Sequence, residues 1–134
     1  MKAVFADTYY FIALLNATDS AHSRATDYSR TSRAQLLSTP WVFTELADGL
    51  SRSPDRHLFR MVWDDFELGP RTRLVWPDES LFRRAMDLYT ARPDKQWSLT
   101  DCISFVVMQN QGVTEALTGD HHFEQAGFVA LLKE

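Results

Sequence analysis

The sequence contains little cysteine and no long apolar run, and each shortage excludes a class of protein. Cys102 is the one cysteine in 134 residues, so an internal disulfide cannot form and no zinc cluster is indicated. No apolar stretch approaches the roughly 18 residues of a membrane-spanning helix. Asp7 also interrupts the first apolar run, where a signal peptide would need an unbroken one. We therefore expect a cytoplasmic protein with no membrane contact.

An excess of basic charge is also absent. The 14 Lys and Arg residues stand against 18 Asp and Glu residues, and the formal net charge is −4. The net charge therefore does not indicate a nucleic-acid partner, but it does not exclude a local basic patch. Hydrophobic residues at 45% and charged residues at 24% are ordinary for a globular protein, which excludes a mainly disordered chain. The length fits one domain, residues 1–134.

Short apolar runs alternate with segments of helical spacing along the whole chain. The runs are nearly continuous, as in strands buried on both faces of a parallel sheet. We expect strands at residues 2–6, 34–40, 72–77, 115–120 and 128–132. We expect helices at residues 8–17, 20–33, 41–52, 55–68, 78–92, 98–111 and 121–126. This alternation predicts an α/β fold of three layers, α/β/α, with a mainly parallel central sheet.

Four acidic residues stand near places where a strand ends or a helix begins. Asp7 follows the first predicted strand and Asp120 follows the fourth. Ligands of open α/β sheets bind at such carboxyl ends of strands. Asp101 heads a helix that has hardly a polar position after it, and Glu45 lies inside a helix among apolar neighbours. These four residues are the candidates for a site.

Each acid taken alone has a simpler interpretation. Asp7 and Asp120 suit the N-cap position of a helix. Ser98 and Asp101 have the spacing of a capping box, and Glu45 suits a solvated helix face. Gathered at one sheet edge, the four carboxylates would repel each other and raise each other's pKa unless a cation neutralised them. Oxygen ligands favour Mg²⁺ or Mn²⁺, and such ions serve phosphodiester hydrolysis.

Four segments, spread over nearly the whole chain, resemble the PIN domain, in particular small single-domain PIN proteins such as the VapC ribonuclease toxins. The segments are FADTYYFIALLN, PWVFTELADGL, WSLTDCISFVVM and ALTGDHHFEQAGF. The resemblance implies a PIN-like fold and a metal-dependent endoribonuclease that hydrolyses RNA phosphodiester bonds. It also implies Mg²⁺ or Mn²⁺ as the cofactor, a small antitoxin protein as a partner, and a homodimer.

The same resemblance assigns roles to particular side chains. By motif position, the catalytic and metal-binding acids are Asp7, Glu45, Asp101 and Asp120. The supporting hydroxyl groups are those of Thr8, Ser98 and Thr118. Ser98 would cap its helix and thereby orient the neighbouring acid.

The chain departs from the family pattern at two positions. Tyr9 stands where the family often has a small hydroxyl residue, and His122 stands where some members carry a further acid. The residue at position 122 leaves open whether the site holds one metal ion or two. We expect His121 and His122 to do structural work at a helix start, because Mg²⁺ sites prefer oxygen ligands; the alternative is that they contact the metal or a leaving group.

The residues that would contact the substrate are less clearly marked in the sequence than the acids. Arg52, Arg56 and Arg60 have a spacing of four residues and could form, with His57, a basic stripe that binds RNA phosphates. The alternative is an ordinary solvated face with local ion pairs.

One rival function is a non-catalytic PIN-like binding or scaffold protein whose acids are caps. Another is an aspartyl-phosphate phosphohydrolase, although Tyr9 occupies the place where that chemistry usually needs a second acid.

Overall fold

A five-stranded sheet lies at the centre of the molecule. The computed structural model describes residues 2–52 and 54–134 of the chain. The strands, in the spatial order β3-β2-β1-β4-β5, are β1 (Ala3–Ala6), β2 (Gln35–Ser38), β3 (Thr72–Leu74), β4 (Glu115–Leu117) and β5 (Val129–Ala130). Every neighbouring pair is parallel. The predicted strands are therefore present, each shorter than its apolar run.

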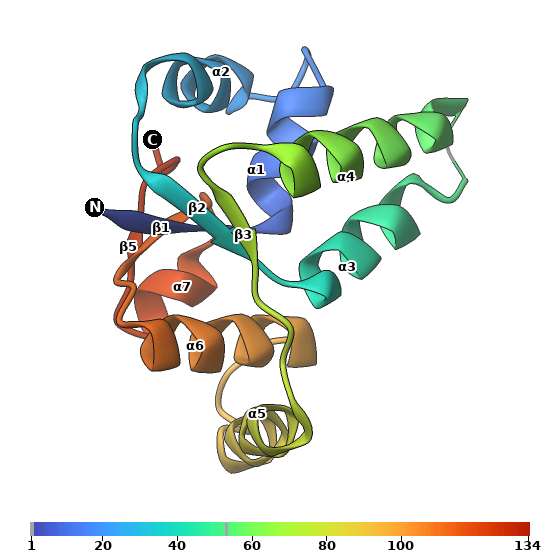
Figure 1. Ribbon diagram of the computed structural model, residues 1–134. Helices are drawn as coiled ribbons and strands as arrows, with labels where there is room; N and C mark the ends of the chain where they lie inside the picture. Colours follow the sequence, from blue (N-terminus) through green and yellow to red (C-terminus); the bar gives the residue numbers. More distant parts are fainter. Residues whose placement is uncertain (1, 53) are drawn as a thin grey trace.

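Helices cover both faces of this sheet, so the predicted α/β/α layering is confirmed (Figure 1). The helices are α1 (Thr8–Leu15), α2 (His22–Thr31), α3 (Pro40–Leu50), α4 (Leu58–Leu68), α5 (Glu79–Ala91), α6 (Leu99–Gln111) and α7 (His121–Gln125). In Figure 1, α1, α2 and α4 lie above the sheet and α6 and α7 lie below it, with α5 packed on α6. Within the described residues, no helix is both long and apolar enough to cross a membrane.

Aromatic side chains fill the space between the sheet and each helix layer. Phe11 of α1, Phe43 of α3 and Phe66 of α4 contact one another, with ring centroids 4.9 to 5.9 Å apart. In the other layer, Phe105 of α6 packs edge-on against Phe123 of α7 at 5.0 Å. Burying such rings is a main source of folding free energy, so these contacts hold the helices on the sheet.

Pro40 has a different role from the predicted one. The sequence predicts that it ends a strand, but it is the first residue of α3. Thr39 is the N-cap, and its Oγ1 accepts a hydrogen bond from the Val42 N–H at 3.2 Å. Proline suits this position because its φ is already helical and the N–H it lacks would have no partner there.

The three arginines of the predicted basic stripe lie in three consecutive segments of the chain. Arg52 lies in the turn after α3, Arg56 lies in the 3₁₀ helix η1 (Pro54–His57), and Arg60 lies in α4. The expectation of one continuous helix over residues 55–68 is therefore wrong at its start. Arg60 also forms an ion pair with Asp64, with 3.0 Å between Nε and Oδ1. A role of the three arginines in RNA binding stays a prediction.

Candidate active site

The sheet topology places four helix or strand ends at one edge. The strand order reverses between β1 and β4, because β2 and β3 follow on one side and β5 on the other. Open α/β sheets bind ligands at the carboxyl ends of the strands beside such a reversal. Asp7 directly follows β1 and Asp120 is the N-cap of α7, just after β4. Since the connecting helices run back against the strands, α6 and α3 begin at this edge and bring Asp101 and Glu45 to it.

The electrostatics show that these four acids share one region. Burial, together with the charges of Asp101 and Glu45, raises the pKa of Asp7 to about 7. Burial also raises the pKa of Glu45, as do the charges of Asp101 and Asp120. The pKa of Asp101 is raised by burial and by Asp120. Side chains that are far apart in the sequence therefore act on one another, as the site hypothesis requires.

Compensating positive charge is scarce around these acids. Within the described residues, their ion pairs involve only His121 and His122, and no lysine or arginine. Four carboxylates without a fixed cation are costly when partly buried. A divalent ion with oxygen ligands would neutralise them, so the donor set fits Mg²⁺ or Mn²⁺.

Each predicted supporting hydroxyl group contacts an acid of the site. The Thr118 Oγ1 donates to Asp7 Oδ2 at 2.9 Å, and the Thr8 Oγ1 donates to Glu45 Oε1 at 2.5 Å. Ser98 and Asp101 form the predicted capping box, in which each side chain accepts the backbone N–H of the other at 3.0 and 3.1 Å. These bonds fix three of the four carboxylates in place.

Helix capping explains two of the acids and leaves two unexplained. Asp120 caps α7 through the His122 N–H at 2.9 Å, and Asp101 belongs to the capping box. Asp7 occupies the N-cap position of α1 but makes no capping hydrogen bond. Glu45 is half-buried and turned towards Thr8 instead of lying on a solvated face. The simpler interpretation therefore fails for Asp7 and Glu45.

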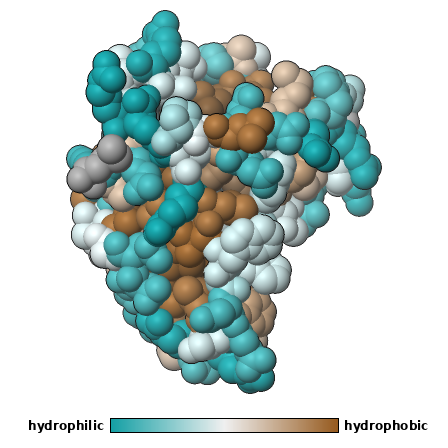
Figure 2. Space-filling model, in the orientation of Figure 1, coloured by the Kyte–Doolittle hydropathy of each residue, from teal (hydrophilic) through white to brown (hydrophobic). Residues whose placement is uncertain are grey.

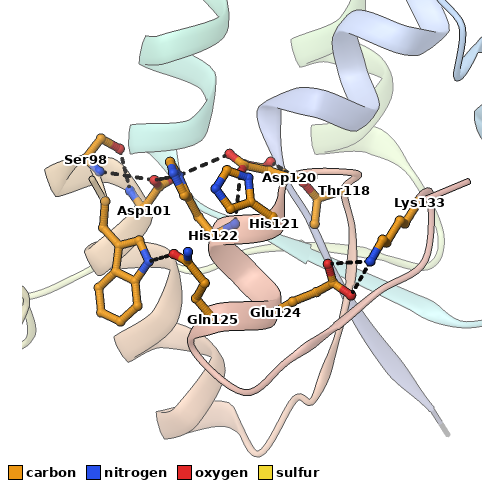
Figure 3. A network of polar contacts seen from close by, with 11 residues as sticks. Ser98, Asp101, Thr118, Asp120, His121, His122, Glu124, Gln125 and Lys133 are labelled. Carbon is orange, nitrogen blue, oxygen red and sulfur yellow. Dashed lines mark hydrogen bonds and ion pairs between the residues drawn. The ribbon is translucent and has the colours of Figure 1, made fainter. Parts of the chain in front are cut away.

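His122 has a place that the sequence did not predict. Its Nδ1 lies 3.1 Å from Asp101 Oδ2 and 3.4 Å from Asp120 Oδ2, so the ring joins the two acids (Figure 3). Asp120, His121 and His122 each place one ligand atom within 4.8 Å of the others, and no other such trio occurs among the residues described. The one indication of this role in the sequence was the position of His122, two residues after Asp120. Asp101 adjoins this group through its contact with His122.

Tyr9 also has an unexpected contact, with the backbone that carries Asp120. A methyl group in place of the Gly119 hydrogen would lie 2.5 Å from the Tyr9 hydroxyl oxygen and 2.6 Å from Cζ. The phenol ring therefore lies directly on the turn between β4 and α7. Tyr9 replaces a small hydroxyl residue with a ring that packs on the site.

Comparison with known proteins agrees with this geometry. The family model of the PIN domain matches residues 4–129. The chain belongs to the PIN domain family. A curated PIN-like relative is the 23S rRNA-specific endonuclease VapC20 of Mycobacterium tuberculosis, which is 26% identical over 131 residues, covering 98% of this chain and 99% of the relative.

Solved structures show the same PIN fold. The crystal structure of Mycobacterium tuberculosis VapC20, described as a Sarcin-Ricin loop cleaving toxin, matches with a TM-score of 0.84 and 25% identity. The match covers 94% of this chain and 96% of that one. A toxin-antitoxin complex from Klebsiella pneumoniae matches with a TM-score of 0.62 and 16% identity, over 88% of this chain and 87% of that one. The predicted family and fold are confirmed.

Proposed function

We propose that this protein is a metal-dependent endoribonuclease, the toxin of a toxin-antitoxin pair. The observation that carries the proposal is the group of four interacting carboxylates at the reversal point of a PIN sheet, which in the described part of the chain have no lysine or arginine partners. The 26% identity to an rRNA-specific endonuclease over nearly the full length supports RNA as the substrate. Helix capping alone does not explain the positions of Asp7 and Glu45.

The metal ion is proposed to be Mg²⁺ or Mn²⁺, held by Asp7, Asp101 and Asp120. When bound, the ion would polarise a phosphoryl oxygen and acidify a water molecule. Thr118 keeps Asp7 Oδ2 in position by its hydrogen bond and, through the Asp120 N–H at 3.0 Å, holds the turn that carries the third acid. One hydroxyl group thus aligns two of the proposed ligands.

Glu45 either completes the ligand set or acts as the base that orients the attacking water. Thr8 occupies Oε1 of this carboxylate, so Oε2 is the atom that would accept a proton from water. The raised pKa of Glu45 makes its carboxylate a better proton acceptor than an exposed glutamate. Attack in line with the scissile P–O bond would then hydrolyse the RNA backbone.

The proposed partners are RNA, an antitoxin and a second copy of the chain. Figure 2 shows apolar surface across the middle of one face, among hydrophilic residues. Large exposed apolar side chains include Trp76, Tyr89 and Met86. Apolar surface of this kind fits protein partners, whereas phosphate contacts would come from arginines such as Arg52, Arg56 and Arg60.

Incubation of the purified protein with a panel of RNAs, including a ribosomal RNA hairpin, tests this function. We expect cleavage with Mg²⁺ or Mn²⁺, none with EDTA, and a loss of at least 100-fold in the Asp101→Asn variant, which keeps a cap acceptor. Equal cleavage by both proteins would indicate a contaminating nuclease. If no RNA is cut and Mn²⁺ shows no saturable binding, the non-catalytic scaffold function is correct instead.

A further inference from the structure

We infer that His122 is itself a ligand of the metal ion, and that its nitrogen makes this site prefer Mn²⁺ to Mg²⁺. The inference rests on the metal site of the proposed function and concerns one residue that departs from the family pattern. It follows from the place of the imidazole ring among the acids.

The position of His122 is fixed by its own backbone. Its N–H donates to Asp120 Oδ1 at 2.9 Å, which leaves Asp120 Oδ2 on the side of the ring, 3.4 Å from Nδ1. On the other side, Asp101 Oδ2 lies 3.1 Å from the same nitrogen and also accepts the Ser98 N–H. Nδ1 therefore points to the space between two proposed ligand carboxylates, as Figure 3 shows.

The neighbouring histidine provides a contrast within the same turn. The side chain of His121 is 71% exposed, whereas that of His122 is 18% exposed. Among the acids of the described residues, His121 approaches Asp120 alone, at 3.6 Å, and its ring lies tilted on the ring of His122 with centroids 4.6 Å apart. A metal ligand needs a fixed orientation, so the less exposed ring, which contacts two carboxylates, is the better donor.

The nature of the donor atom decides the choice of metal. Mg²⁺ requires hard oxygen ligands and retains most of its water, whereas first-row transition ions accept imidazole nitrogen readily. Asp101, Asp120 and the Nδ1 of His122 form a mixed nitrogen-oxygen set. His122 thus adds a nitrogen donor at the position where some family members carry a further acid. The nitrogen donor favours Mn²⁺.

Binding of Mn²⁺ alone to the whole protein tests the inference without any assay of RNA cleavage. Pulsed electron paramagnetic resonance of bound Mn²⁺ should show coupling to a directly bound ¹⁴N nucleus in the wild type and in His121→Asn. The coupling should vanish in His122→Asn and in His122→Asp. By calorimetry, His122→Asn should weaken Mn²⁺ binding about tenfold or more and change Mg²⁺ binding less than about threefold.

The outcomes separate this inference from the proposed function. Saturable Mn²⁺ binding that is weakened by Asp101→Asn but shows no ¹⁴N coupling would refute His122 as a ligand and leave the metal site intact. Coupling lost in His121→Asn and kept in His122→Asn would also refute it. Absence of any Mn²⁺ binding would refute both. The His122→Asp variant restores an all-oxygen set, so a folded His122→Asp that still prefers Mn²⁺ as strongly as the wild type would contradict the inference.

Discussion

At the scale of single residues, Asp7 is a buried carboxyl group whose negative charge a bound cation would neutralise. The residue is 6% exposed, and its pKa is raised from 3.8 to about 7, mainly by burial. The folded, metal-free protein therefore binds a proton at this site more tightly than the unfolded chain does. The contribution of Asp7 to the free energy of unfolding therefore falls as the pH rises from about 4 to about 7, where Asp7 becomes charged in the folded state.

The variant Asp7→Asn should remove this loss of stability. At pH 8 in EDTA, we expect its free energy of unfolding to exceed that of the wild type by roughly 2–4 kcal/mol, because a neutral amide still accepts the Thr118 bond. Urea unfolding between pH 4 and 8 measures this. Asp27→Asn is the matched control, since Asp27 is exposed on α2 and should change stability by less than about 0.5 kcal/mol. An Asp7→Asn protein less stable than the wild type would contradict the prediction.

Two buried serines provide a second residue-level prediction. Within the described residues, Ser104 Oγ on α6 is buried without a hydrogen-bond partner, whereas Ser38 Oγ on β2 donates to the Ala6 carbonyl at 2.9 Å. Ser104→Ala should therefore stabilise the protein by about 1 kcal/mol, and Ser38→Ala should destabilise it by about 1 kcal/mol. Thermal and urea unfolding measure both changes. A change of stability with the same sign in both variants would refute the assignment of Ser104 Oγ as unpaired and of Ser38 Oγ as hydrogen-bonded.

At the scale of elements, the turn between β4 and α7 connects fold and site. Thr118, Gly119 and Asp120 occupy consecutive positions there, and Tyr9 of α1 lies directly on the glycine. Thr118 joins this turn to Asp7 after β1 by a bond between residues 111 positions apart. The position of Asp120 thus depends on how α1 packs on the turn.

Gly119→Ala should displace this turn. The new methyl group would clash with the Tyr9 ring, so we expect a loss of about 1–3 kcal/mol in the free energy of unfolding and weaker Mn²⁺ binding. Adding Tyr9→Ser should recover part of both, which a double-mutant cycle would detect. Gly49→Ala is the control: Gly49 lies in α3 with open space around it, and its change should stabilise by about 0.5–1 kcal/mol. Additive effects of the first two changes would refute the coupling.

At the scale of the whole molecule, the metal-free chain holds four carboxylates near one another at one sheet edge, where their charges repel. A ligand that binds only the folded state raises the free energy of unfolding of the whole chain. The four acids come from four separate parts of the chain, next to β1, in α3, in α6 and after β4. A bound cation would therefore join both helix layers to the sheet.

Mn²⁺ at 100 times its Kd should raise the free energy of unfolding of the wild type by about 2.7 kcal/mol. Differential scanning calorimetry with and without the metal measures this. NaCl at equal ionic strength controls for screening, and Asp101→Asn should respond far less than the wild type. An equal response of both proteins would show that Mn²⁺ binds elsewhere.

The order and type of the elements were predictable from the sequence, because apolar spacing and caps act over short distances. Ser98 and Asp101 illustrate this, since their capping box follows directly from their spacing. The start of α3 at Pro40 was mispredicted because strand-ending and helix-starting prolines look alike in sequence. The start of the helix predicted at residues 55–68 was mispredicted because a 3₁₀ turn, here η1, and the first turn of an α-helix have similar residue patterns.

By itself, the sequence determined that strands alternate with helices, that acids follow two of the strands, and that the chain resembles a PIN domain. Only the tertiary structure decided that Asp7 lies against Thr118, that Glu45 meets Thr8, and that His122 lies between two carboxylates. The physical reason is range. Spacing and propensity act over a few residues, whereas these contacts depend on how the helices pack across the sheet.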